Sequence, residues 1–113
     1  MAVPADIYAW IHELFQDIGG ISWRAMMGGL AIYSEGRIFA IFGGPERQLY
    51  IKAVGPLAED LAREGASSFS YIHRSGRRME MGYWTLPDAA LDDPDAACAW
   101  ARRSLAASDP DFS

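Results

Sequence analysis

Residues 24–33, with the sequence RAMMGGLAIY, decide the fold of this chain. A charged residue enters a predicted strand, two methionines follow, and two glycines interrupt the alternation before an apolar run that ends at Tyr33. Glycines inside a strand pattern indicate a bulge or a sharp bend. The stretch therefore predicts a strand, a bend and a second strand, and it contains no reactive group of a familiar catalytic kind.

Segments downstream extend the same sheet. GRIFA at residues 36–40 follows a short turn signal, and LYIK at residues 49–52 follows a second one. We predict strands over residues 22–27, 30–34, 37–42 and 49–51. Two more, over residues 69–74 and 77–84, flank Ser75-Gly76 in a hairpin where Met79, Met81 and Tyr83 share one face.

Three helical segments accompany these strands. Six apolar residues recur at helical spacing and predict an amphipathic helix over residues 4–18. They are Ile7, Trp10, Ile11, Leu14, Phe15 and Ile18. Pro56 begins a second helix that Gly65 ends, Pro87 begins a short helical turn, and Asp93-Pro94 begins a last helix.

The order of these elements indicates the fold class. It is helix, three or four strands, helix, two strands, helix, or α-β(3-4)-α-β(2)-α. Because βαβ alternation is absent and the turns are short, we expect an α+β fold in two layers, with a largely antiparallel sheet and helices on one face. A chain of 113 residues is expected to form one domain over residues 1–113, with an ordered core at about 4–106 and a frayed tail.

One predicted strand does not alternate. Residues 38–42, IFAIF, are apolar on both faces, whereas a sheet covered on one side should alternate. The second face therefore needs a cover. Either a segment of the same chain or a partner subunit would supply it, and homodimerisation through the open sheet face is a hypothesis.

Composition and charge narrow the class of protein. The chain has a formal net charge of −5, which opposes binding to nucleic acid or to an anionic membrane. Its single cysteine, Cys98, excludes an internal disulfide framework. The amino terminus lacks the pattern of a signal peptide, and the longest apolar run is far shorter than a membrane span. We expect a cytoplasmic protein.

Residues with catalytic or metal-binding potential are isolated. His12 and His73 have no further ligand at a metal-site spacing, so we expect no metal. Cys98 lies among alanines near the start of the last helix, where Asp93 and Asp95 would raise its pKa, and it reads as a packed thiol. We expect no catalytic residue and no cofactor.

The hairpin concentrates basic residues. His73, Arg74, Arg77 and Arg78 lie near Tyr71, Tyr83 and Trp84. Arginines interleaved with aromatic residues can hold single-stranded nucleic acid by phosphate contacts and stacking. The alternative is a solvated hairpin tip over core aromatic residues.

Taken together, these residues resemble the amino-terminal domain of the TfoX/Sxy family of bacterial competence regulators. The resemblance runs in order along nearly the whole chain. Its elements are Arg24-x-Met26-x-Gly28-Gly29, Tyr33, Gly36, Phe39-Ala40, Leu49-Tyr50-Ile51-Lys52, Phe69-x-Tyr71, Met79-x-Met81-x-Tyr83, Pro87 and Trp100-Ala101. Met27 departs from the pattern, because the family more often has phenylalanine there, but this exchanges one large apolar group for another.

The resemblance implies a two-layer domain with an antiparallel sheet, similar to type III secretion chaperones, which are dimers that bind partner polypeptides. The family has no established catalytic residues to carry over. Full-length competence regulators have a second, helical carboxy-terminal domain, and we expect this chain to be a stand-alone copy of the first.

We therefore expect a non-enzymatic interaction domain that serves transcriptional regulation of DNA uptake, or of a related programme, through protein contacts. The expected contact surface is the open sheet face, with the arginine hairpin. Its residues are Phe39, Ile41, Tyr50, Arg74, Arg77 and Arg78. Two other classes stay open: nucleic-acid binding through the three arginines, and a small-molecule site or enzyme with a pocket lined by Met26, Met27, Tyr33 and Tyr83.

Overall fold

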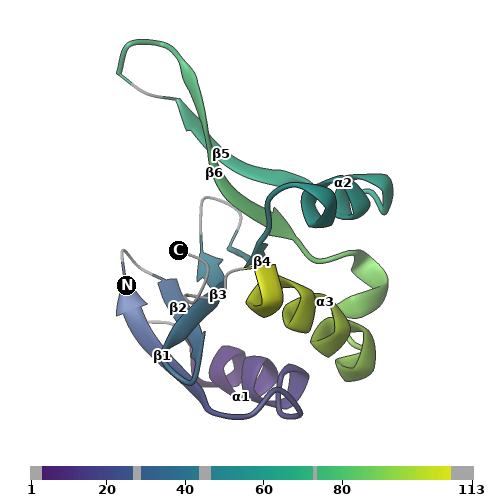
Figure 1. Cartoon of the computed structure of the whole chain (residues 1–113). Coiled ribbons are helices and arrows are strands. Elements are labelled where there is room, and N and C mark those ends of the chain that lie inside the picture. Colours follow the sequence, from purple (N-terminus) through teal and green to yellow (C-terminus); the bar gives the residue numbers. More distant parts are fainter. Residues whose placement is uncertain (1–3, 27–28, 44–46, 73, 108–113) are drawn as a thin grey trace.

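Six strands pair into one sheet in the computed structural model, which describes residues 4–26, 29–43, 47–72 and 74–107. The strands are β1 (Ile21–Met26), β2 (Gly29–Ser34), β3 (Arg37–Gly43), β4 (Gln48–Lys52), β5 (Ser68–Ile72) and β6 (Arg78–Thr85). Their order across the sheet is β1-β2-β3-β4-β6-β5, and every neighbouring pair is antiparallel. The expected α+β class and antiparallel sheet are confirmed (Figure 1).

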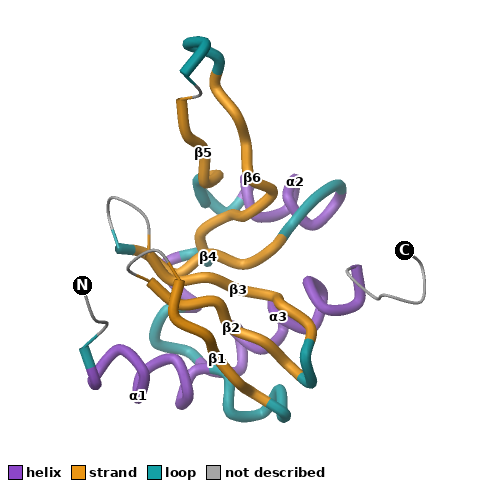
Figure 2. The backbone as a smooth tube through the Cα atoms, turned by 90° about the vertical axis from the view of Figure 1, so that its left-hand side faces the viewer, coloured by secondary structure: helices purple, strands orange, loops and turns teal. Residues whose placement is uncertain are grey.

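The helices are α1 (Ala5–Leu14), α2 (Pro56–Arg63) and α3 (Pro94–Ala107), with a short 3-10 turn, η1 (Asp88–Ala90), before α3. Helices α1 and α3 lie on one side of strands β1 to β4, and Figure 2 shows the other side toward the viewer, with no described helix over it. None of the helices in the described ranges has the length and apolar composition of a membrane-spanning segment.

Two helix ends differ from the predictions. α1 stops at Leu14, and residues 15–18 form turns that lead into Gly19 and Gly20, both with positive φ. The apolar stripe continues past the helix because Phe15 and Ile18 still face the core from those turns. α3 continues to Ala107, so the first residues of the expected frayed tail are helical. Residues 108–113 lie outside the described residues, as do the predicted strand end and bend at 27–28 and the predicted turn at 44–46.

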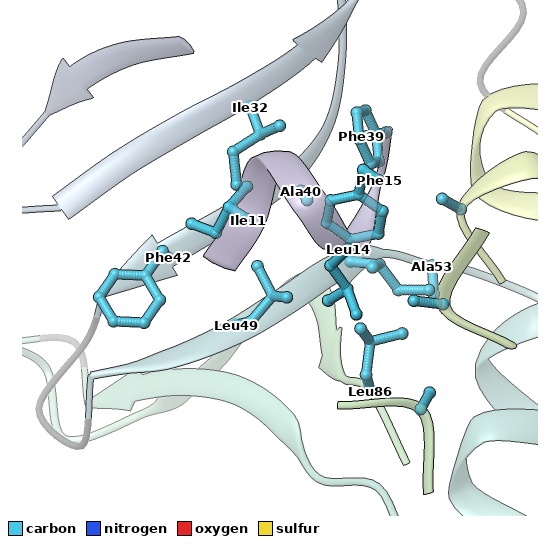
Figure 3. Close-up of a cluster of buried hydrophobic side chains, with 14 of the residues drawn as sticks. Ile11, Leu14, Phe15, Ile32, Phe39, Ala40, Phe42, Leu49, Ala53 and Leu86 are labelled. Carbon is cyan, nitrogen blue, oxygen red and sulfur yellow. The ribbon is translucent and has the colours of Figure 1, made fainter. Parts of the chain in front are cut away.

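The core lies between the sheet and the helices (Figure 3). α1 contributes Ile11 and Leu14, and the sheet contributes alternate residues of β2 and β4 together with three residues of β3. α2 adds Leu57 and Leu61, which lie one helical turn apart. The remaining members include Ile32, Phe42, Leu49, Ile51, Leu86, Ala97, Ala101 and Leu105. Burial of this one cluster on one side of the sheet is what holds the helices against it.

A bulge interrupts β3. Ile32 of β2 pairs with Ala40, but the next residue, Tyr33, pairs with Ile38, so Phe39 is an extra residue in the ladder. Such a bulge bends the strand and leaves backbone groups without their regular ladder partners. The buried hydroxyl of Ser104 on α3 lies 2.6 Å from the carbonyl oxygen of Lys52 and 3.5 Å from that of Phe39. Ser104 thus fastens α3 to the sheet at the bulge.

Candidate functional site

Phe39 lies in the core and not on the open sheet face where the sequence placed it. Its side chain is 0% exposed, and its ring packs edge-to-face on Phe15, with the centroids 5.1 Å apart (Figure 3). The bulge is the physical reason, because Phe39 and its neighbour Ala40 both enter the core, which regular alternation forbids. Phe39 is therefore a packing residue and not part of a contact surface.

Ile41 and Tyr50 do belong to the face that no described helix covers. They are cross-strand partners on β3 and β4, and their neighbours Phe42 and Leu49 enter the core on the opposite side. Both are nevertheless buried, at 5% and 7% exposure. Phe69 of β5 stacks on Tyr50, with ring centroids 5.0 Å apart and planes inclined by 27°. Ile41 and Tyr50 form the floor of this face.

Tyr33 and Tyr83 are half-buried residues of the same face. Burial raises the pKa of the Tyr83 hydroxyl, and the phenol of Tyr33 raises it further. Tyr33 lies on β2 and Tyr83 on β6, with β3 and β4 between them. We call Tyr33, Ile41, Tyr50, Phe69 and Tyr83 the aromatic face.

The second apolar face of β3 is largely covered within one chain. Sequence reasoning left two alternatives, a further segment of the chain or a partner subunit. Ile41 is almost inaccessible in the single chain, and the ring of its cross-strand partner Tyr50 stacks on Phe69. A helix over this face is not needed for that burial, and homodimerisation stays a prediction.

The small-molecule pocket expected from the sequence is described only in part. Tyr33 and Tyr83 lie on the same face of the sheet, on β2 and β6, and the pocket itself stays a prediction. Met27 and the side chain of Met26 lie outside the described part of the chain. Phe69 is the aromatic residue that sequence reasoning did not assign to this surface. Its signal is the alternation Phe69-x-Tyr71, which places it on a strand but does not show which face it joins.

Arg74 and Arg77 lie at the turn of the β5–β6 hairpin, which projects from the body of the molecule in both views (Figures 1 and 2). Both are exposed, and the ion pairs found among the described residues involve neither of them. At the base of the hairpin, the Thr85 N–H donates to the Ser67 carbonyl oxygen at 2.9 Å. Arg78 begins β6, but its side chain and all of His73 lie outside the described residues.

A cavity of about 390 Å³ opens on the helix-covered side of the sheet. It lies between α1, η1 and the ends of β3, β4 and β6. Its lining residues are Ile7, Trp10, Phe42, Arg47, Gln48, Leu49, Thr85, Leu86, Asp88 and Leu91. We call it the helix-side cavity. No local sequence motif predicts it, because its lining comes from four separate stretches of the chain, within residues 7–10, 42, 47–49 and 85–91.

Of the two residues weighed as ligand or nucleophile, His12 is exposed on α1 and Cys98 is buried. The His12 ring lies edge-on to Trp23, with centroids 6.2 Å apart. Cys98 is buried, and its thiol lies 3.4 Å from the Leu14 carbonyl oxygen as a donor. Burial raises the pKa of the Cys98 thiol, so the protonated form is favoured. Among the described residues, no three side chains of the metal-ligating types gather.

Comparison with known proteins finds a match to one protein family. The model of the TfoX N-terminal domain matches residues 13–108. The matched range includes every residue of the aromatic face and the whole β5–β6 hairpin. No curated protein matches the chain.

Proposed function

The chain belongs to the TfoX N-terminal domain family, and from this premise we propose that it is a non-enzymatic interaction domain that binds a partner protein. Through that contact it serves transcriptional regulation of DNA uptake, or of a related programme, in the cytoplasm. The competence regulators that share the domain motivate the role, and the surfaces of the molecule motivate the mode of action.

The aromatic face is the observation that supports this proposal. Its half-buried members are two tyrosines and a phenylalanine, and both residue types are enriched at protein interfaces. A sheet face without a described helix over it leaves room for an element of a partner (Figure 2). The contact would lie on Tyr33, Phe69 and Tyr83, with Ile41 and Tyr50 as the rigid floor beneath.

Site-specific photo-crosslinking in the native cytoplasm tests this proposal. A benzoylphenylalanine at position 83, and separately at position 33, should give a discrete adduct, because both side chains are partly accessible on the aromatic face. The same probe at position 63, whose arginine side chain is 68% exposed on α2, is the control. Adducts that are the same from all three positions, or absent from all, would contradict the proposal.

The mass of the adduct separates the two kinds of partner. An adduct of twice the chain mass identifies a homodimer, and any other discrete mass identifies a different protein. Phe39→Asp is unsuitable as an interface variant, because a charge at this buried position would disrupt the core.

A second candidate function is nucleic-acid binding at the hairpin turn. The observation that favours it is the projection of exposed Arg74 and Arg77 away from the acidic body of the molecule (Figure 1). Phosphate contacts predict an affinity for single-stranded DNA that falls steeply with salt concentration. Fluorescence anisotropy with wild type and with the Arg74→Gln, Arg77→Gln double variant measures this. Absent or salt-independent binding would exclude the candidate.

A further inference from the structure

We infer that the helix-side cavity is a binding site for a small zwitterion with an apolar side chain, of the class of the free hydrophobic amino acids. The inference goes beyond the proposed function and uses the opposite side of the sheet. At about 390 Å³ the cavity falls at the lower end of the roughly 300–1,000 Å³ that is usual for small-molecule sites.

The deep part of the cavity is apolar. Phe42, Leu49 and Leu86 are buried residues that form its floor. They come from the end of β3, the start of β4 and the residue after β6, so the rigid sheet fixes their positions. An apolar group of a ligand would replace water over this floor, which is favourable in proportion to the area covered.

The side wall is held in place by a hydrogen bond. The indole N–H of Trp10 donates to the Leu91 carbonyl oxygen at 3.0 Å, and both residues line the cavity. The Trp10 ring also lies edge-on to Phe42, with centroids 6.5 Å apart. This bond joins α1 to the segment after η1 across the cavity. A preformed wall lowers the cost of ordering the site when a ligand binds.

The rim carries one charge of each sign. Arg47 and Asp88 are exposed and line the same cavity. Within the described part of the chain both ion pairs are made by Asp60, so neither rim charge is neutralised by the other or by a described neighbour. The Arg47 guanidinium lies over the Phe42 ring, 5.7 Å from its centroid, which directs the cation toward the apolar floor.

The backbone at Arg47 supports the same conclusion. Its φ of 52° is in the left-handed region, which a residue with a long side chain seldom adopts. Strained backbone of this kind clusters at ligand sites, where the surrounding structure imposes it.

These features together select the class of ligand. A hydrocarbon would leave both rim charges unused, and a simple carboxylate would satisfy Arg47 but approach the carboxylate of Asp88. A zwitterion satisfies both charges, with its carboxylate on Arg47 and its ammonium group on Asp88. Its side chain then lies on the floor of Phe42, Leu49 and Leu86.

Titration of the isotope-labelled chain with phenylalanine tests the inference by NMR. The probe is the indole N–H signal of Trp10, together with the backbone amides of Leu49 and Leu86. We expect saturable shifts of these signals. Two analogues keep the ring but only one charge, 3-phenylpropionate and phenethylamine, and each should bind at least about tenfold more weakly because one rim charge stays unpaired. Equal affinity of either analogue and phenylalanine would overturn the inference.

Rim variants provide the second test. Arg47→Gln and Asp88→Asn change exposed side chains, so the fold should survive, and each should weaken phenylalanine binding by about tenfold. Arg63→Gln on α2, which does not line the cavity, should bind as wild type does. The inference is wrong if wild type shows no shifts at about 10 mM phenylalanine, tenfold above a Kd of about 1 mM, or if both rim variants bind unchanged.

Discussion

At the scale of single residues, Gly29 is the position where the sheet has least room for a side chain. A Cβ built there would lie 2.1 Å from the carbonyl oxygen of Phe42, and neither backbone can move without breaking the β2–β3 ladder. We expect Gly29→Ala to lower the free energy of unfolding by about 3 kcal/mol, as severe overpacking does. Urea denaturation measures it.

A matched glycine separates this overlap from a general effect of alanine. Gly65 follows α2 with φ of 90°, and a Cβ there would meet nothing within 4 Å. Gly65→Ala should therefore lower the free energy of unfolding by about 1 kcal/mol, which is the penalty for a left-handed backbone alone. If the two substitutions lowered the free energy of unfolding equally, the close approach of Gly29 to the Phe42 carbonyl oxygen would not be the cause.

Ser104 is a second residue whose small side chain should contribute measurably to stability. Its buried hydroxyl donates to the Lys52 carbonyl oxygen at 2.6 Å. In Ser104→Ala that partly buried oxygen loses the Ser104 hydroxyl as a donor, so we expect the free energy of unfolding to fall by about 2 kcal/mol. Ser22→Ala, on the exposed side of β1, is the control and should change stability by less than about 0.5 kcal/mol. If Ser104→Ala left the free energy of unfolding unchanged, the bulge would need no support from α3.

At the scale of secondary-structure elements, the carboxylate of Asp60 joins α2 to α3. It forms a salt bridge with Arg103 at 2.7 Å and a second one with Arg63 on its own helix. Arg103, and then Arg63, lower the pKa of Asp60 below its ordinary value of 3.8. A carboxyl group with a lowered folded-state pKa stabilises the protein above the unfolded-state pKa, and this contribution is lost as the pH falls through the folded-state value.

Asp60→Asn tests this link between the helices. At neutral pH the variant should melt at a slightly lower temperature than wild type, because exposed ion pairs contribute little. The difference should disappear as the pH falls below 3.8 and through the lowered pKa, and it should shrink in high salt. Glu59→Gln, an exposed neighbour, is the control. A difference in melting temperature that persists in acid would contradict the assignment.

The β5–β6 hairpin is the element with the least support from the core. It lies at the edge of the sheet, and Phe69 of β5 stacks on Tyr50 of β4. Such a stack is worth about 1 kcal/mol beyond the area that it buries. In Phe69→Ala, amide hydrogen exchange should accelerate in β5 while the central strands β2 and β3 keep their protection. Uniform acceleration across the sheet would contradict this local role.

The elements also show how far the sequence can predict this fold. Alternation and turn signals identify the strands, because these depend on neighbours along the chain. The bulge at Phe39 depends instead on how β2 pairs with β3, so the pattern IFAIF places Ile41 on the open face correctly and Phe39 wrongly. The helix-side cavity is beyond such reasoning, since Trp10, Phe42 and Leu86 are distant in sequence and meet only in the folded chain.

At the scale of the whole molecule, the sheet separates two candidate surfaces by the thickness of one strand layer. On β3, Ile41 belongs to the aromatic face while the next residue, Phe42, lines the helix-side cavity. On β4, Tyr50 and Leu49 divide in the same way. Successive side chains of a strand point to opposite faces, so a substitution at the rim of one surface leaves the other in place.

We therefore expect the two activities to be separable. Arg47→Gln should weaken phenylalanine binding and leave the photo-adduct from position 83 unchanged. Conversely, Tyr83→Ser should reduce capture of the partner by a probe at position 33 and leave the phenylalanine-induced shift of the Trp10 indole signal intact. The physical reason is that Phe42, Leu49 and Leu86, the floor of the cavity, are fixed by the core and do not depend on Tyr83. If either variant lost both activities while keeping its melting temperature, the two faces would be coupled through β3 and β4. The two surfaces would then not be independent.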